Sequence, residues 1–291
     1  MFSGMGQDGM IDAGSVEARS RRSEAEGSFP FAGSLMRLGG CVALDGRVSW
    51  APRLPGHYQP VSCYVARQGE RPVLVDTGIA LHRDAVLRQL DAVIPPGRPL
   101  TTFLTRTELE CTGNLGALHA AGRIARIVNA GAIGPFDAFD DALEGSVPMS
   151  LIPLGTGSFA AVDEAETLYV IPAFIRMLST MWVFDATSRT LFSTDFFGHT
   201  SVASPRDPAV IGSLTEDRTS RESARAHLLA KFWWLPRART SAMRNWLAGI
   251  FDRFDVEIIA PTHGCILSGR PVVRRHLELM LRLLREMEED R

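Results

Sequence analysis

Two acidic side chains and a cysteine lie within four residues of one another near the middle of the chain. Glu108, Glu110 and Cys111 belong to segment 105–113, which follows an apolar run. Carboxylate and thiolate groups bind zinc or iron, so this spacing is typical of a metal-binding loop. The loop contains no histidine, the other common ligand, and its capacity for a metal is therefore the first question about function.

Two further metal-binding side chains follow apolar segments later in the chain. Asp195 comes directly after residues 190–194, and His263 comes shortly after residues 256–260. Side chains just past strand ends gather at one edge of the sheet in α/β proteins, so these residues and the loop form a candidate site. Taken singly, Asp195 is equally well explained as a strand-end cap, and His263 as part of a structural turn.

The elements that would position these side chains alternate between strand and helix patterns. A hairpin is predicted over 61–66 and 71–76, and Pro236 is expected to interrupt a long helical stretch. The pattern predicts an α/β fold with layers of helices over sheets. The predicted strands are 61–66, 71–76, 101–105, 124–128, 167–171, 181–185, 190–194 and 256–260; the predicted helices are 79–93, 113–121, 221–251 and 271–291.

Composition limits the partners and the number of domains. A chain of 291 residues, 45% of them hydrophobic, is long enough for one large domain, and a net charge of -2 disfavours nucleic acid or an anionic membrane as the main partner. Four cysteines without a CxxC pair argue against a disulfide framework and favour a reducing cytoplasm. We expect a disordered tail over 1–29, a single domain over 30–270 and an amphipathic helix over 271–291. No segment is apolar enough to span a bilayer.

The order and content of these segments resemble the metallo-β-lactamase fold, and most of all its oxygen-reducing flavodiiron branch, over about residues 61–267. The first loop is similar to T-H-x-E-x-D-H-x-G, in which Glu108 matches the glutamate that distinguishes the diiron branch from hydrolases. Segment 192–198 is similar to F-S-x-D-x-F-G, which carries the bridging Asp195, and segment 260–264 is similar to A-P-x-H-G, which carries His263. The resemblance implies a single-domain αββα sandwich.

The same resemblance divides the binuclear centre into two unequal halves. Around the first metal it places Arg106, Glu108 and a share of Asp195, with Arg176 at the position of another histidine. Arginine has no lone pair to donate, so this half cannot hold a cation. We therefore expect the two guanidinium groups to replace the first metal and to pair with Glu108 and Asp195.

The second half keeps a complete set of donors in Glu110, Cys111, Asp195 and His263. Three alternatives remain open: the donors make ordinary hydrogen bonds and bind no metal, they hold one iron or zinc ion, or His199 completes the site. Cys111 is either a small space-filling residue or a thiolate stabilised by the arginines.

Aromatic and histidine side chains outside the motifs also have expected places. Phe232, Trp233, Trp234 and Trp246 form a lid over the site or, the preferred alternative, pack in the core or at a dimer surface. The helical histidines, which we expect to be solvent-facing or partly buried and without a role, are His82, His119, His227 and His276. His57 is expected to be a surface residue.

The predicted function is that of a pseudoenzyme: a ligand or redox sensor, or an accessory subunit, with at most one bound metal. The first alternative is a mononuclear metal-dependent hydrolase. The second is an oxygen or nitric oxide reductase with a separate electron donor, because the chain has no room for a flavodoxin-like domain and hence carries no flavin. The expected partners are a small anionic or diatomic ligand, a second copy of the chain, or an electron-transfer partner.

Overall fold

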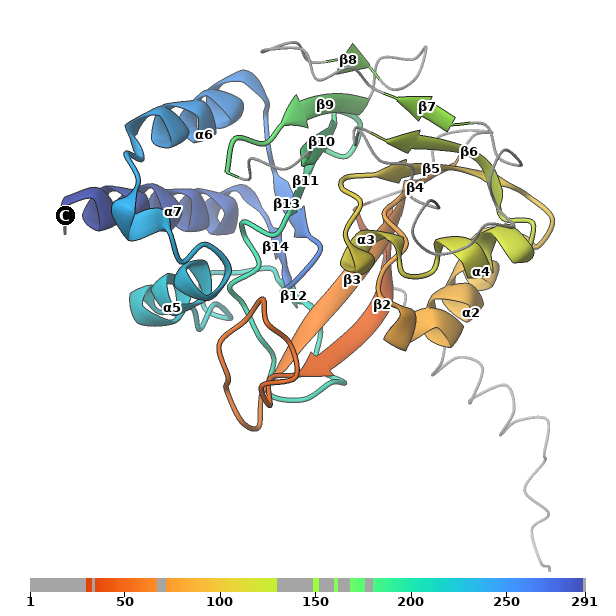
Figure 1. The fold of residues 1–291 in the computed structure, drawn as a ribbon, viewed down its shortest axis with the longest axis horizontal. Coiled ribbons are helices and arrows are strands. Elements are labelled where there is room, and N and C mark those ends of the chain that lie inside the picture. The colour runs from red at the N-terminus through yellow and green to blue at the C-terminus, as the bar shows by residue number, and fades with distance from the viewer. Residues whose placement is uncertain are drawn as a thin grey trace, which may run out of the picture.

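Two seven-stranded β-sheets face each other, with helices covering their outer faces (Figure 1). The computed structural model describes residues 30–32, 35–66, 72–129, 149–151, 160–161, 168–175 and 180–289. The arrangement confirms the αββα sandwich predicted from the sequence. The expected tail over residues 1–29 lies outside the described residues.

In the first sheet the strands lie in sequence order, antiparallel from β1 to β4 and parallel from β4 to β7. The pairing of β3 with β4 confirms the predicted hairpin. Parallel neighbours need a crossover, which helices supply between β4 and β6. The strands are β1 (Pro30–Ala32), β2 (Leu35–Ala43), β3 (Tyr58–Ala66), β4 (Val73–Val75), β5 (Leu100–Leu104), β6 (Ile124–Asn129) and β7 (Met149–Leu151). The crossovers contain η1 (Ala80–His82), α2 (Arg83–Val93), α3 (Leu109–Thr112) and α4 (Leu115–Ala120).

The second sheet has the order β12-β14-β13-β11-β10-β9-β8, with β11 parallel to β13. Three helical segments connect these two strands across the outer face, and Pro236 separates α5 from α6 as expected. The strands are β8 (Ala160–Ala161), β9 (Leu168–Pro172), β10 (Met181–Asp185), β11 (Thr190–Thr194), β12 (Val210–Ile211), β13 (Ile258–Pro261) and β14 (Ile266–Ser268). The helical segments are α5 (Arg221–Lys231), η3 (Leu235–Arg237) and α6 (Ser241–Arg253).

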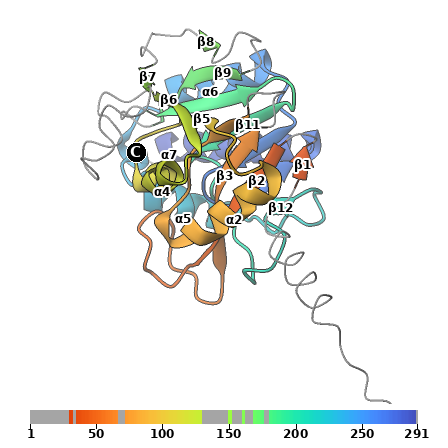
Figure 2. The same ribbon diagram turned by 90° about the vertical axis from the view of Figure 1, so that its right-hand side faces the viewer.

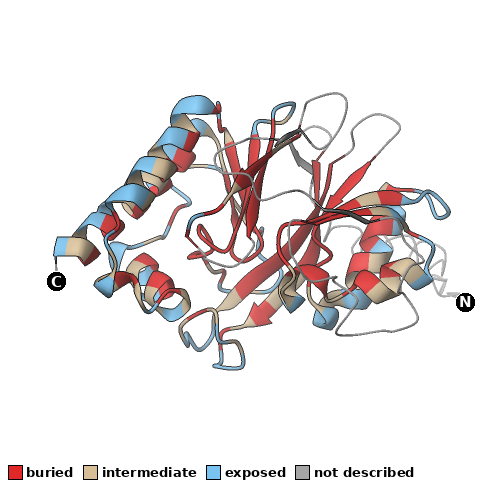
Figure 3. Ribbon diagram, turned by 45° about the horizontal axis from the view of Figure 1, so that its top comes forward, coloured by how far each residue is buried: buried red, intermediate tan, exposed pale blue. Residues whose placement is uncertain are grey.

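Apolar side chains from both sheets meet in the centre of the sandwich, where Tyr64 and Phe103 of the first sheet share a cluster with Val183 and Phe192 of the second. Helices α2 and α4 cover the first sheet, and α5, α6 and α7 (Arg270–Glu289) cover the second (Figure 2). Burial alternates around α7, whose inner face is buried and outer face exposed (Figure 3). Such a stripe is what an amphipathic helix presents to a core.

None of the helices in the described part of the chain combines the length and the apolar character that crossing a membrane requires.

Candidate functional site

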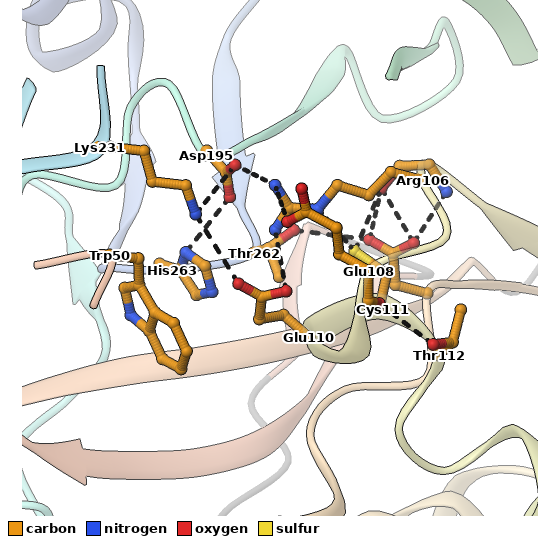
Figure 4. A network of polar contacts seen from close by, with 12 residues as sticks. Trp50, Arg106, Glu108, Glu110, Cys111, Thr112, Asp195, Lys231, Thr262 and His263 are labelled. Carbon is orange, nitrogen blue, oxygen red and sulfur yellow. Dashed lines mark hydrogen bonds and ion pairs between the residues drawn. The ribbon is translucent and has the colours of Figure 1, made fainter. Parts of the chain in front are cut away.

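Loops that follow β5, β11 and β13 converge at one edge of the sandwich (Figure 4). Because β11 and β13 are parallel, Asp195 and His263 emerge at the same end of the second sheet. The loop after β5 brings Arg106 to Asp195 from the first sheet. Arg106 and Asp195, which are 89 positions apart in the sequence, thus meet in one buried cluster. We call this cluster the ion network; its members are Arg106, Glu108, Glu110, Cys111, Asp195, Lys231 and His263.

Arg106 lies at the centre of the ion network, and its side chain is only 2% exposed. Its Nη1 pairs with Asp195 Oδ2 and lies 3.4 Å from Glu108 Oε2, while its Nε donates a hydrogen bond to Cys111 Sγ at 3.2 Å. Burial alone would lower the pKa of Arg106, but Asp195, Cys111 and Glu108 raise it well above its ordinary value. The guanidinium is therefore a fixed positive charge.

Lys231, which lies outside the predicted motifs, is also a member of the ion network. Lys231 is the last residue of α5, and its side chain is 3% exposed. Its Nζ lies 3.0 Å from Asp195 Oδ2 and 3.8 Å from Glu110 Oε1. Burial lowers the pKa of Lys231, and the charge of Asp195 opposes that shift. Lys231 is the only lysine among the 31 basic residues of the chain, and this is the signal that could have drawn attention to it.

Asp195 holds three partners at once. Its Oδ1 lies 3.3 Å from His263 Nδ1, and its Oδ2 faces both cations. Burial would raise the pKa of Asp195, but Arg106 and Lys231 lower it well below its ordinary value, so the carboxylate is ionised.

His263 is fully buried and lies beneath an aromatic ring. Burial lowers the pKa of its imidazole to about 3, which leaves the ring neutral at pH 7. The indole of Trp50 stacks on the imidazole, with ring centroids 4.6 Å apart and planes 3° from parallel. Trp50 Nε1 donates to Gln59 Oε1 at 2.9 Å, and this bond holds the indole in place. Trp50 was not among the residues predicted for the site.

The loop that carries Arg106 is anchored by a buried carboxylate at the end of the neighbouring strand. Asp76 Oδ1 accepts a hydrogen bond from the Thr105 backbone N–H at 2.8 Å, and Asp76 Oδ2 accepts one from Thr105 Oγ1 at 2.8 Å. Burial raises the pKa of Asp76 to about 6. Asp76 also has a φ of 59°, a strained conformation that these bonds help to maintain.

The ion network brings together most of the residues predicted from the motifs. Glu108, Glu110, Cys111, Asp195 and His263 all contact Arg106, Lys231 or one another. Arg176, predicted to be the second substituting arginine, lies outside the described residues.

Three histidines form a separate buried cluster on the outer side of the second sheet. His199, the candidate additional ligand, instead points to α7, where its Nε2 lies 2.8 Å from His276 Nδ1. His276 Nε2 lies 3.2 Å from Asp217 Oδ2, and the ring of His227 packs against His199. The expectation that His227 and His276 are solvent-facing or partly buried is wrong: they are 3% and 0% exposed, because α5 and α7 pack against each other over them.

The aromatic residues of the helical stretch lie mainly in the core. Phe232 is 1% exposed, and Trp234 and Trp246 pack against the core of the second sheet. This agrees with the preferred alternative of core packing for these three. Trp233 differs, since 77% of it is exposed.

Among the described residues, two cations and three carboxylates carry the charge of the ion network: Arg106 and Lys231 face Glu108, Glu110 and Asp195. In the described ranges, no group of three or more histidine, cysteine, aspartate or glutamate side chains is arranged to hold a metal ion. The carboxylates face the side chains of Arg106 and Lys231, and the attraction between opposite charges offsets the cost of burying them.

We predict that Cys111 is unreactive in the native protein. Its side chain is fully buried, and burial raises the pKa of its thiol well above the ordinary value, although Arg106 lowers it. Treatment with iodoacetamide followed by mass spectrometry should modify Cys111 only after unfolding in urea. Cys41, which is partly exposed, serves as the internal comparison. Alkylation or peroxide oxidation of Cys111 in the folded protein would instead indicate a thiolate.

Solved structures of flavodiiron proteins share this architecture. Rubredoxin oxygen:oxidoreductase from Desulfovibrio gigas superposes with a TM-score of 0.63 at 17% identity, over 89% of this chain and 61% of that protein. The chain has the flavodiiron core fold. The metal-soaked Flv1 flavodiiron core from Synechocystis gives a TM-score of 0.64 at 16% identity, over 87% of this chain and 60% of that one.

This chain spans about three-fifths of the length of these two proteins. A fragment of a diflavin flavoprotein from Nostoc, residues 1–254, is matched over 96% of its length, with a TM-score of 0.63 and 13% identity. No protein-family model matches the sequence, and no curated protein does. The likeness therefore concerns the fold.

Proposed function

We propose that this chain is a remodelled protein of flavodiiron core fold that acts as a sensor of a small ligand or as an accessory subunit, and that it does not reduce oxygen or nitric oxide. One observation carries the proposal: the Arg106 guanidinium pairs with Asp195 and lies 3.4 Å from Glu108, the carboxylates that the motif resemblance assigns to the first metal. A reductase needs redox-active iron at both positions. Arginine cannot be a ligand, and its charge repels a cation.

A hydrolase with a single metal is less well supported. Such an enzyme needs a Lewis-acidic ion with an open coordination position. The Lys231 ammonium lies 3.0 Å from Asp195 and 3.8 Å from Glu110, two of the donors that the ion would require. The residues of the ion network thus do not fit a metal-dependent reaction, and we derive no catalytic step from them.

Two buried polar atoms support the binding of a small polar ligand. Arg106 Nη2 and His263 Nε2 have no hydrogen-bond partner among the described residues. Because His263 Nδ1 faces the Asp195 carboxylate and carries the proton, His263 Nε2 is an acceptor, whereas Arg106 Nη2 is a donor. A small polar ligand that accepts from Arg106 Nη2 or donates to His263 Nε2 would satisfy a buried group, and buried polar groups are nearly always satisfied.

Partnership with another protein is the second part of the proposal. The Desulfovibrio gigas relative is named as an oxidoreductase of rubredoxin and oxygen, and it is longer than this chain. We infer that this chain works with a further protein, or with a second copy of itself, in the cytoplasm. The exposed indole of Trp233, two residues after Lys231, is the kind of side chain that interfaces favour.

The test is the metal content and oxygen consumption of protein purified without chelator. Elemental analysis should find fewer than two metal ions per chain, and the visible spectrum should lack iron absorption. With a chemical electron donor, the protein should consume oxygen no faster than a heat-denatured sample. Two irons per chain together with oxygen or nitric oxide turnover would contradict the proposed function.

A further inference from the structure

Lys231 has a position in the ion network that suits a compact cation. Both Arg106 Nη1 and Lys231 Nζ contact the same oxygen of Asp195, so this carboxylate bridges two positive charges. The two cations also share Glu110, with Lys231 Nζ 3.8 Å from Oε1 and Arg106 Nη2 4.0 Å from Oε2. An ammonium is a compact point charge, whereas a guanidinium is a planar fork, and the two are not interchangeable in such a place.

The composition of the chain makes this choice of residue notable. Of its 31 basic residues, Lys231 alone is lysine, and the rest are arginine. The one ammonium side chain of the protein is thus almost fully buried, with 3% of it exposed, between two carboxylates. Lysine is rarely buried to this degree unless it is paired.

We propose that the Lys231 ammonium takes the place of the second metal ion, so that the native chain binds no metal, and that removing this ammonium opens a site for one divalent cation. This inference rests on the proposed function, which assigns the first position to Arg106. It goes further because it assigns the second metal position to Lys231. It therefore predicts that the native chain binds no metal ion, whereas the sequence alone left open the binding of one.

Charge and donor chemistry support the second half of the proposal. Without Lys231, Glu108, Glu110 and Asp195 would keep Arg106 but lose one of the two cations described beside them, and the lost charge would need replacement. Asp195, Glu110 and His263 are not grouped as metal ligands while Lys231 is in place. Loss of the ammonium would release Asp195 and Glu110 from it, and with His263 they supply the oxygen and nitrogen donors that zinc accepts. His263 Nε2 has no hydrogen-bond partner among the described residues, so its lone pair is available to a cation.

The experiment compares the wild-type protein with Lys231→Met, which keeps the unbranched side chain as far as Cε and removes the ammonium group. Wild-type protein dialysed against zinc chloride should hold far less than one zinc per chain, and its melting temperature should be the same in zinc and in EDTA. Lys231→Met should gain about one zinc per chain and melt at a higher temperature in zinc than in EDTA. Stoichiometric zinc in the wild-type chain would overturn the proposal, as would a folded Lys231→Met protein that gains none.

Two matched variants test whether any zinc gained by Lys231→Met is bound at the position of Lys231. Lys231→Arg keeps a positive charge and should remain metal-free. Adding His263→Gln to Lys231→Met removes one donor and should abolish the gained zinc, and a gain that survives this change would place the ion elsewhere and contradict the proposal. If Lys231→Met does not fold in zinc or in EDTA, Lys231→Gln replaces it, because its amide can still donate to Asp195.

The outcomes separate this inference from the proposed function. One zinc per wild-type chain without turnover would overturn the role of Lys231 and leave the sensor or accessory function intact. Two irons with turnover would overturn both.

Discussion

Replacing Arg106 by methionine is expected to lower the free energy of unfolding by about 3–5 kcal/mol, the usual cost of removing one member of a buried charged network. Methionine fills much of the space of the arginine stem but provides neither charge nor donor. Lys231 would remain in contact with the carboxylates of Glu110 and Asp195 but would not replace the lost guanidinium. Urea unfolding followed by tryptophan fluorescence measures the loss.

Arg274→Met is the matched control. The Arg274 side chain is 81% exposed and makes one ion pair, 3.0 Å long, with Glu278 one turn further along α7. Exposed pairs of this kind contribute about 0.5 kcal/mol or less, so the control should unfold almost as the wild-type protein does. A loss at Arg106 no larger than the loss at Arg274 would mean that the guanidinium does not hold the ion network together.

Acidification should destabilise the protein well before its surface carboxylates are protonated. Burial lowers the pKa of His227 from 6.5 to about 4. Between pH 6.5 and pH 4 the imidazole of His227 binds a proton in the unfolded chain but not in the native chain. The contribution of His227 to the free energy of unfolding is therefore fully present above pH 6.5 and is lost as the pH falls toward 4. In this range one such histidine lowers the free energy of unfolding by about 1.4 kcal/mol for each pH unit of acidification.

Other buried groups change the size of this effect. His263, with a pKa of about 3, acts in the same direction over a wider range. Asp76 opposes it: its pKa is raised from 3.8 to about 6, so the native carboxyl binds a proton before the unfolded one does. Urea unfolding at a series of pH values from 7 to 4.5 gives the net slope. In His227→Leu the slope should be smaller by about 1.4 kcal/mol per pH unit, and an unchanged slope would rule out this assignment.

Periodicity and turn residues were sufficient to predict most of the fold. The hairpin, the strands that carry the site and the amphipathic helix all lie where apolar spacing indicated. Six strands were not predicted, namely β1, β2, β7, β8, β12 and β14. Among them, β2 makes the longest pairing in the first sheet. Gly39 explains why β2 was missed: its φ is +125°, and a Cβ there would lie 2.2 Å from the carbonyl oxygen of Val61. The glycine that the pairing requires is a residue that sequence rules read as breaking a strand.

The candidate site was predictable only where a motif marks it. Arg106, Glu108, Glu110, Cys111, Asp195 and His263 follow strands, and strand order brings them together. Lys231 lies at the end of a helix, and nothing in its neighbours indicates that α5 turns this residue toward Asp195. His227 was misjudged for the same reason, since burial of a helical residue depends on the packing of α5 against α7.

The ion network also couples the two halves of the sandwich. Arg106 follows strand β5 of the first sheet, and Asp195 follows strand β11 of the second. Lys231 is the last residue of α5, which covers the outer face of the second sheet. Opening at this edge would separate Arg106 and Lys231 from Asp195, and it would expose Trp50 and His263 at the same time. Local unfolding of a loop on one sheet would therefore break ion pairs with the other sheet and raise the free energy of both. We expect this edge to open as a single cooperative unit, which makes the network a determinant of how the protein unfolds as well as of what it binds.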